Sequence, residues 1–215
     1  GLEAHGINMC AITDHDCFDK DLYLALKERE GDGCLNKVLP GIEFSVSIRA
    51  DGKKPTVVHI VAIFDDRHPD LIDGIAEVVC DENGKPRYDD LNNGAFTEDG
   101  FAKVLRDIGL NAVLIGHEKS AGQEAKRDVS SLGANCASEV ILTEFVDAVE
   151  IRNKRRELDI KRLIETYPKD AVPFVVGSDC HDWATYPGKE GGEISFSSLK
   201  CLPTFEGLLM AITDP

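Results

Sequence analysis

Short, almost continuous apolar runs recur along this chain and alternate with amphipathic stretches. The runs predict buried β-strands at residues 8–13, 38–46, 57–64, 112–116, 145–151 and 172–177, the second with a break at Pro40-Gly41. The amphipathic stretches predict helices at about 19–30, 69–79, 98–108 and 154–166, and from Thr204 onward. Apolar strands that alternate with helices indicate an α/β fold whose sheet is largely parallel and covered on both faces.

The composition excludes several classes of protein. The 215 residues suffice for one domain with its own core, and we expect residues 1–215 to form a single domain. Hydrophobic residues make up 42% of the chain, which argues against disorder. The net charge of −15 argues against a broad basic face for nucleic acid. No apolar run could span a bilayer and no signal-peptide pattern opens the chain, so we expect a cytoplasmic protein without a membrane partner.

The cysteines fit a reducing compartment. There are 7, and none stands in a Cys-x-x-Cys pair. An odd number at irregular spacing argues against a disulfide framework and against a zinc site made of thiolates.

Histidines and carboxylates gather where the predicted strands end. His15 and His117 end such runs, His181 follows another, and His59 lies inside one. Acids share these positions, namely Asp14, Glu43, Glu150 and Asp179. The carboxyl ends of parallel strands meet at one edge of a sheet, where sites form. One such residue is more often a hydrogen-bonded side chain or a helix cap, but the whole set predicts a site for Zn, Mn or Fe. By contrast, the contexts of His5 and His68 indicate structural or surface roles.

The order of the motifs carries a family resemblance. The segments are Ile-Thr-Asp-His-Asp (12–16), Pro-Gly-Ile-Glu-Phe (40–44), Val-Val-His-Ile-Val (57–61), Ile-Gly-His (115–117), Val-Glu-Ile-Arg-Asn (149–153) and Gly-Ser-Asp-Cys-His (177–181). Over residues 1–185 the chain resembles the polymerase and histidinol phosphatase (PHP) domain. The resemblance implies a distorted (β/α)7 barrel with a dinuclear or trinuclear metal site. It also implies hydrolysis of phosphate esters, on small molecules or nucleic-acid ends, by a metal-activated hydroxide.

The resemblance assigns a role to each matching residue. The metal ligands that it implies are His15, Glu43, His59, His117, Asp179 and His181. Glu43 would bridge two ions, with His59 and His117 completing the second and Asp179 joining the first.

The remaining roles concern the third ion and catalysis. His15 and His181 would hold the third ion, and Asp14 would orient a neighbouring ligand or a water. The residues expected to act in catalysis are Asp14, His15, His117 and Asp179. We expect two to three ions of Mn, Zn or Fe in an intact site.

The beginning of the chain departs from the family pattern. PHP domains open with a strand that carries His-x-His, whereas residues 1–7 resemble the helix after that strand, and His5 has no histidine partner. We therefore expect a barrel that is incomplete at its N-terminus, in which Glu43, His59 and His117 can still hold an ion. Residues 195–209 resemble the end of PHP modules that precede an ATPase domain in large bacterial proteins, which implies an ATPase partner.

Two alternatives to a phosphoesterase remain open. A regulatory or interaction module of a larger ATPase, with a decayed site, would explain the absent His-x-His, although the retained ligand residues oppose it. Metal-dependent hydrolysis of a different bond is disfavoured, because no lysine stands at a strand end as in amidohydrolases. Lys119 and Arg152 are candidate phosphate contacts, but solvated surface charges are the more common case.

Overall fold

The computed structural model describes residues 2–49, 55–117, 146–150, 173–175, 186 and 198–213. The elements in these ranges are η1 (Leu2–His5), β1 (Met9–Ile12), α1 (Lys20–Lys27), β2 (Lys37–Ile48), β3 (Thr56–Phe64), α2 (Pro69–Val79), β4 (Phe96–Thr97), α3 (Glu98–Ile108), β5 (Ala112–His117), β6 (Ala148–Glu150), β7 (Phe174–Val175) and α6 (Phe205–Thr213). No helix in the described ranges is long and apolar enough to cross a membrane.

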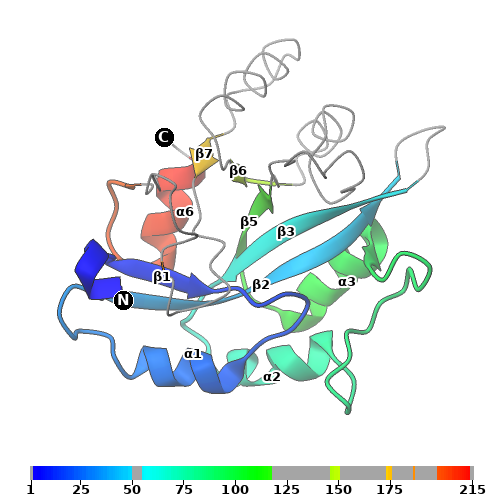
Figure 1. The fold of residues 1–215 in the computed structure, drawn as a ribbon, viewed down its shortest axis with the longest axis horizontal. Coiled ribbons are helices and arrows are strands. Elements are labelled where there is room, and N and C mark those ends of the chain that lie inside the picture. The colour runs from blue at the N-terminus through cyan, green and yellow to red at the C-terminus, as the bar shows by residue number, and fades with distance from the viewer. Residues whose placement is uncertain are drawn as a thin grey trace, which may run out of the picture.

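The strands form one curled, mixed sheet (Figure 1). Its order is β1-β2-β3-β5-β6-β7, with β4 paired to β2. Strand β3 runs antiparallel to both of its neighbours, β2 and β5, whereas β1–β2, β5–β6 and β6–β7 are parallel pairs. The α/β class is confirmed, and the curl is compatible with part of an α/β barrel. The prediction of a largely parallel sheet is wrong at its centre, because an apolar run shows that a strand is buried without showing its direction.

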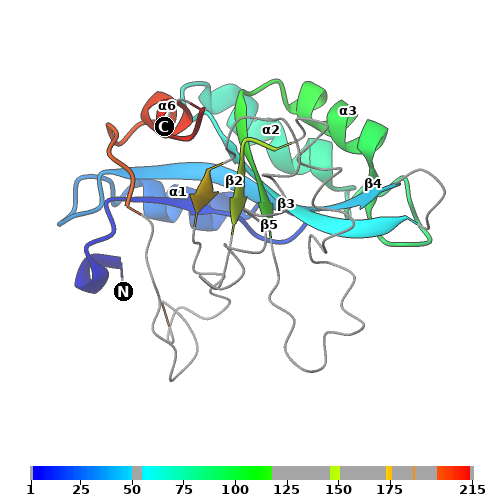
Figure 2. The ribbon, with the colours of Figure 1, turned by 90° about the horizontal axis from the view of Figure 1, so that it is seen from above.

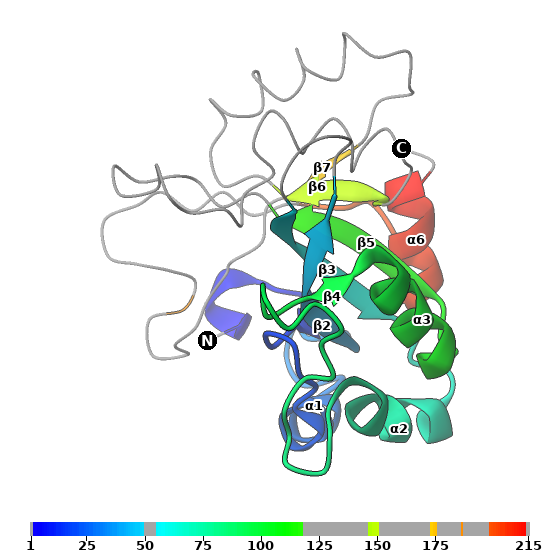
Figure 3. The same ribbon diagram turned by 90° about the vertical axis from the view of Figure 1, so that its right-hand side faces the viewer.

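Helices pack on both faces of the sheet. Side chains alternate between faces along a strand, and Ile42 and Phe44 face a core built with α1, α2 and α3. Helices α2 and α3 run next to each other there (Figure 2). Leu39 faces the opposite side, where Phe205 and Leu208 of α6 pack on β5 and β6. Figure 3 shows α6 beside these strands. Glu43 is four residues after Leu39 on β2, so both side chains lie on the same face. Helix α6 covers this face near Leu39, and Glu43 lies on it farther along the strand.

Strand β2 passes through Pro40 and Gly41 without the expected break. Residues 37–40 pair with β1 and residues 41–48 pair with β3, so the dipeptide marks a change of partner. A Cβ on Gly41 would lie 2.8 Å from the carbonyl oxygen of Ala62 and 2.9 Å from Cγ2 of Thr13. Glycine is therefore needed because the strands approach one another closely at this position.

The helices in the described ranges begin at the predicted residues or one residue later. Thr97 caps α3, since its hydroxyl accepts a hydrogen bond from the N–H of Gly100, and Gly109 ends the helix at a φ of 73°. Asp19 caps α1 through the N–H of Leu22, but the helix ends at Lys27, before the predicted boundary. The helix predicted at 154–166 lies outside the described residues.

Candidate metal centre

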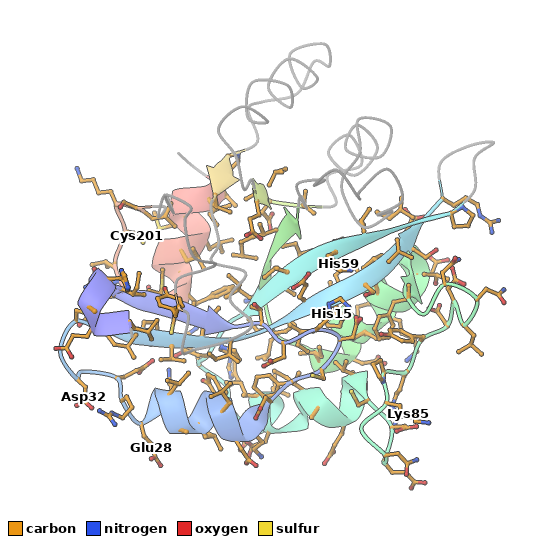
Figure 4. All side chains as sticks on the ribbon, in the orientation of Figure 1. His15, Glu28, Asp32, His59, Lys85 and Cys201 are labelled. Atoms are coloured by element: carbon orange, nitrogen blue, oxygen red, sulfur yellow. The ribbon has the colours of Figure 1, made fainter. Side chains whose placement is uncertain are left out.

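Three predicted ligands come together at one edge of the sheet: His15, Glu43 and His59. Nδ1 of His59 lies 2.7 Å from Oε1 of Glu43, and Nδ1 of His15 lies 3.9 Å from the same oxygen. The two imidazole rings are 4.6 Å apart between centroids, and Figure 4 shows their neighbouring positions. One ligand atom from each residue lies within 4.8 Å of the other two, a spacing at which the group could hold a metal ion.

The strand register explains this convergence. Ser45 pairs with His59 across β2 and β3, so Glu43, two residues before Ser45, is a diagonal neighbour of His59 on the same face. His15 follows the carboxyl end of β1 and forms a bridge with Glu43. Because β3 runs antiparallel to β2, the amino-terminal half of β3 lies at the edge where β1 ends. His59 belongs to this half and therefore lies near His15.

The same register extends toward two further predicted residues. His59 is the Cα partner of His117 on β5, and His117 is the partner of Glu150 on β6. Glu150 is buried, with 6% of its surface exposed. The backbone therefore places His59, His117 and Glu150 in one row across three strands, although the structure does not describe the side chain of His117.

The three candidate ligands differ in their exposure to solvent. The side chains of Glu43 and His59 are 12% and 9% exposed, whereas that of His15 is 49% exposed. Burying a carboxylate is costly unless cations or hydrogen-bond donors compensate it. Within the group, Glu43 and His59 form the buried part, and His15 forms the part that is open to solvent.

The donor set fits a divalent transition-metal ion. Two imidazoles and a carboxylate are ligands that Zn, Mn and Fe accept. Ligand atoms that bind one ion at about 2.1 Å lie about 3.0–3.4 Å from one another, because the angles between bonds are near 90–110°. The separations of 2.7 and 3.9 Å from Oε1 of Glu43 are close to this range, so small side-chain rotations would admit an ion.

A polar cluster behind His15 was not identified from the sequence. The carboxylate of Asp16 is 1% exposed and accepts hydrogen bonds from the hydroxyls of Ser45 (2.7 Å) and Tyr88 (2.8 Å). Nε2 of His15 lies 3.1 Å from both Ser45 Oγ and Asp16 Oδ2. Tyr88 is 72 residues from Asp16 in sequence, so no local pattern connects the two residues. Side chains alternate between the two faces along β2, which places Ser45 on the same face as Glu43, and this is the one sequence signal for part of the cluster.

Asp14 lies against Glu43 through the backbone. Its carbonyl accepts a hydrogen bond of 3.0 Å from the N–H of Glu43, while its Oδ2 is buried and has no hydrogen-bond partner within the described residues. Burial, and then the nearby charge of Asp19, raises the pKa of Asp14. Its role in orienting a ligand or a water stays a prediction.

The other predicted site residues lie outside the described ranges. These are Asp179 and His181, together with the candidate phosphate contacts Lys119 and Arg152. A scan against protein-family models and a search of curated proteins found no significant match to the chain. The fold and the site therefore define an α/β protein with a candidate metal centre at one edge of its sheet.

Proposed function

We propose that this protein is a metal-dependent phosphoesterase of the PHP type. The observation that carries the proposal is the convergence of His15, Glu43 and His59 from three separate sequence motifs. Each of the three residues lies within an apolar strand motif or directly after one. A chance set of ligand residues from three segments would not be expected to meet within coordination distance.

The arrangement of the sheet supports the same proposal. Five of the six motifs that resemble the family begin on β1, β2, β3, β5 and β6, whereas residues 177–181 lie outside the described ranges. Among the described residues, His15, Glu43 and His59 lie together, and the strand register places the backbone of His117 beside His59. A curled sheet with ligands at one edge suits part of a barrel whose site lies at the strand ends.

Glu43, His59 and His15 would have different roles at the metal centre. A bound divalent cation would lower the pKa of a water molecule and polarise the phosphoryl group. Glu43 and His59 are buried on the paired strands β2 and β3, so their backbone positions are fixed. His15 lies on the exposed side, where a phosphate ester could reach the centre.

The net charge of the chain favours small-molecule substrates or the ends of nucleic-acid strands over the interior of a long nucleic acid. A net charge of −15 would repel a long polyanion, whereas a single phosphate group needs only local contacts. The substrate class that we propose is therefore a phosphomonoester, either on a small molecule or at a nucleic-acid end.

The test combines metal content with hydrolysis. Purified protein would be analysed for Mn, Fe and Zn and assayed with p-nitrophenyl phosphate and a 3′-phosphorylated oligonucleotide, before and after treatment with a chelator. Glu43→Gln is the decisive variant, and Glu28→Gln, which removes one charge from the exposed end of α1, is the matched control.

We expect the wild type and Glu28→Gln to bind metal and to hydrolyse at least one ester in a chelator-sensitive manner. Glu43→Gln should lose both properties. Metal binding without hydrolysis would favour a module with a decayed site instead. A wild-type protein that binds none of these metals would refute the proposal.

A further inference from the structure

We infer that Asp16 and Ser45 fix the tautomer of His15, with the proton on Nε2, so that His15 offers Nδ1 to the cation. The part about the cation rests on the proposed function, whereas the part about the tautomer rests on contacts within the chain. Asp16 then acts as a positioning residue that sets which nitrogen of His15 is the ligand.

The hydrogen bonds around Nε2 determine where the proton lies. The hydroxyl of Ser45 has one proton, which it donates to Asp16 Oδ2 over 2.7 Å. At 3.1 Å from His15 Nε2, Ser45 Oγ can then only accept. Asp16 Oδ2, also 3.1 Å from Nε2, is an acceptor when ionised. Two acceptors at one ring nitrogen require that Nε2 carries the proton.

The opposite ring nitrogen faces the candidate ligands. In a neutral imidazole with a proton on Nε2, Nδ1 has the lone pair that a metal ion requires. Nδ1 of His15 is the atom that lies 3.9 Å from Oε1 of Glu43. Carboxylates that accept a hydrogen bond from the second nitrogen of a ligating histidine orient the ring and raise its basicity.

Asp16 is held firmly enough to perform this task. Its N–H donates to the carbonyl of Glu43 over 2.8 Å, and its Oδ1 accepts from the N–H of Ser45 over 2.7 Å. Its φ of 52° lies in the left-handed region, which aspartate tolerates better than most residues. A buried residue that keeps an unfavourable backbone conformation beside candidate ligands suggests a positioning role.

Tyr88 also holds the carboxylate of Asp16 in place. Its hydroxyl donates to Asp16 Oδ2 over 2.8 Å. Burial, and then the hydrogen bond to Asp16, raises the pKa of Tyr88, which therefore remains a protonated donor. The carboxylate thus stays fixed whether or not a cation is present.

The tautomer can be observed directly by nuclear magnetic resonance. Protein with ¹⁵N-labelled histidine, freed of metal, would give long-range ¹H–¹⁵N spectra at about pH 8, above the ordinary titration range of histidine. The spectrum of His15→Gln would assign His15 among the 6 histidines. We expect a protonated Nε2 in the wild type and, on addition of zinc, a shift of the Nδ1 resonance.

Asp16→Asn tests the positioning role, with Asp107→Asn on α3 as a control of equal charge change. Asparagine keeps the size of the side chain and also tolerates a positive φ. In Asp16→Asn we expect a mixture of tautomers and zinc affinity lower by about 10–100-fold, as measured by competition with a chelating dye. Asp107→Asn should match the wild type in both measurements.

The outcomes separate this inference from the proposed function. A wild type without zinc binding would refute the metal centre, and the spectrum of the metal-free protein would still decide the role of Asp16. A proton on Nδ1 of His15, a zinc-induced shift at Nε2, or unchanged zinc affinity in Asp16→Asn would overturn the inference. The wild-type spectrum decides even if Asp16→Asn fails to fold.

Discussion

Nδ1 of His59 and Oε1 of Glu43 lie 2.7 Å apart on paired strands, and both residues are buried. An imidazole and a carboxylate in such a position can share a proton or bind a cation between them. The register of β2 with β3 sets this geometry, because it pairs Ser45 with His59 and so makes Glu43 a diagonal neighbour of His59 on the same face. The proximity of His59 and Glu43 is therefore a consequence of sheet architecture.

Metal binding should stabilise the folded chain. An ion that binds only the native state raises the free energy of unfolding by about 2.7 kcal/mol when its free concentration is 100-fold above the dissociation constant. We expect zinc to raise the midpoint of thermal unfolding in the wild type and a chelator to reverse the effect. Differential scanning calorimetry would measure both, and Glu43→Gln should show no response. An equal response in Glu43→Gln would place the ion elsewhere.

Gly41→Ala should destabilise the fold. The new Cβ would lie 2.8 Å from the backbone oxygen of Ala62, which cannot move without disturbing β3. We expect a loss of about 1–3 kcal/mol in the free energy of unfolding, measured by urea denaturation. Gly74→Ala in α2 is the control, because its Cβ meets no atom within 4 Å. That change should stabilise the helix by about 0.5–1 kcal/mol. Equal effects at both glycines would contradict this account of β2.

His117→Ala should weaken metal binding more than a surface histidine substitution does. The register pairs His117 with His59 and ends β5 at the same edge, so we expect His117 to be a ligand. Elemental analysis after gel filtration would count the ions retained, and His68→Ala is the control, since His68 precedes α2. Retention of every ion in His117→Ala would remove this residue from the site.

Acid should weaken the ion cluster that ties α1 and β2 to the end of β3. Asp66 accepts hydrogen bonds from Lys27 and Lys37. Burial alone would raise the pKa of Asp66, but these two lysines lower it overall. A lowered folded-state pKa means that the stabilisation is complete above the unfolded value of about 3.9. It is lost as the pH falls through the folded value.

Asp66→Asn tests this dependence. Near neutral pH the substitution should cost about 1.5–3 kcal/mol in urea denaturation, the range for hydrogen bonds to charged groups. The difference from the wild type should begin to shrink as the pH falls below about 4, where the unfolded state takes up a proton, and should vanish below the lowered folded-state pKa of Asp66, where the folded state is protonated too. A difference that stays constant down to pH values of about 2–3 would contradict the assignment.

The sequence was sufficient to indicate the three candidate ligands that lie together in the structure. His15 and Glu43 follow or lie within apolar strands, and a histidine inside such a strand, His59, is unusual enough to notice. The direction of β3 could not be predicted, because a buried strand has the same apolar pattern in either direction. Pro40 was misleading for a related reason: proline is tolerated where a strand changes its pairing partner.

The cluster behind His15 shows what local patterns miss. Asp16, Ser45 and Tyr88 meet through turns and strand pairing over long sequence separations. The unusual φ of Asp16 has no sequence signal of its own, since aspartate also occurs in ordinary turns. Such supporting residues become visible only when the fold brings them next to a candidate ligand.

The position of a bound ion tests the central claim most directly. Crystals of the protein soaked in zinc would give an anomalous difference map at the zinc absorption edge. We predict a peak at about 2.0–2.2 Å from a Glu43 carboxylate oxygen and from one nitrogen each of His15 and His59. A map with no peak among these three residues, although zinc binds elsewhere on the protein, would contradict the account.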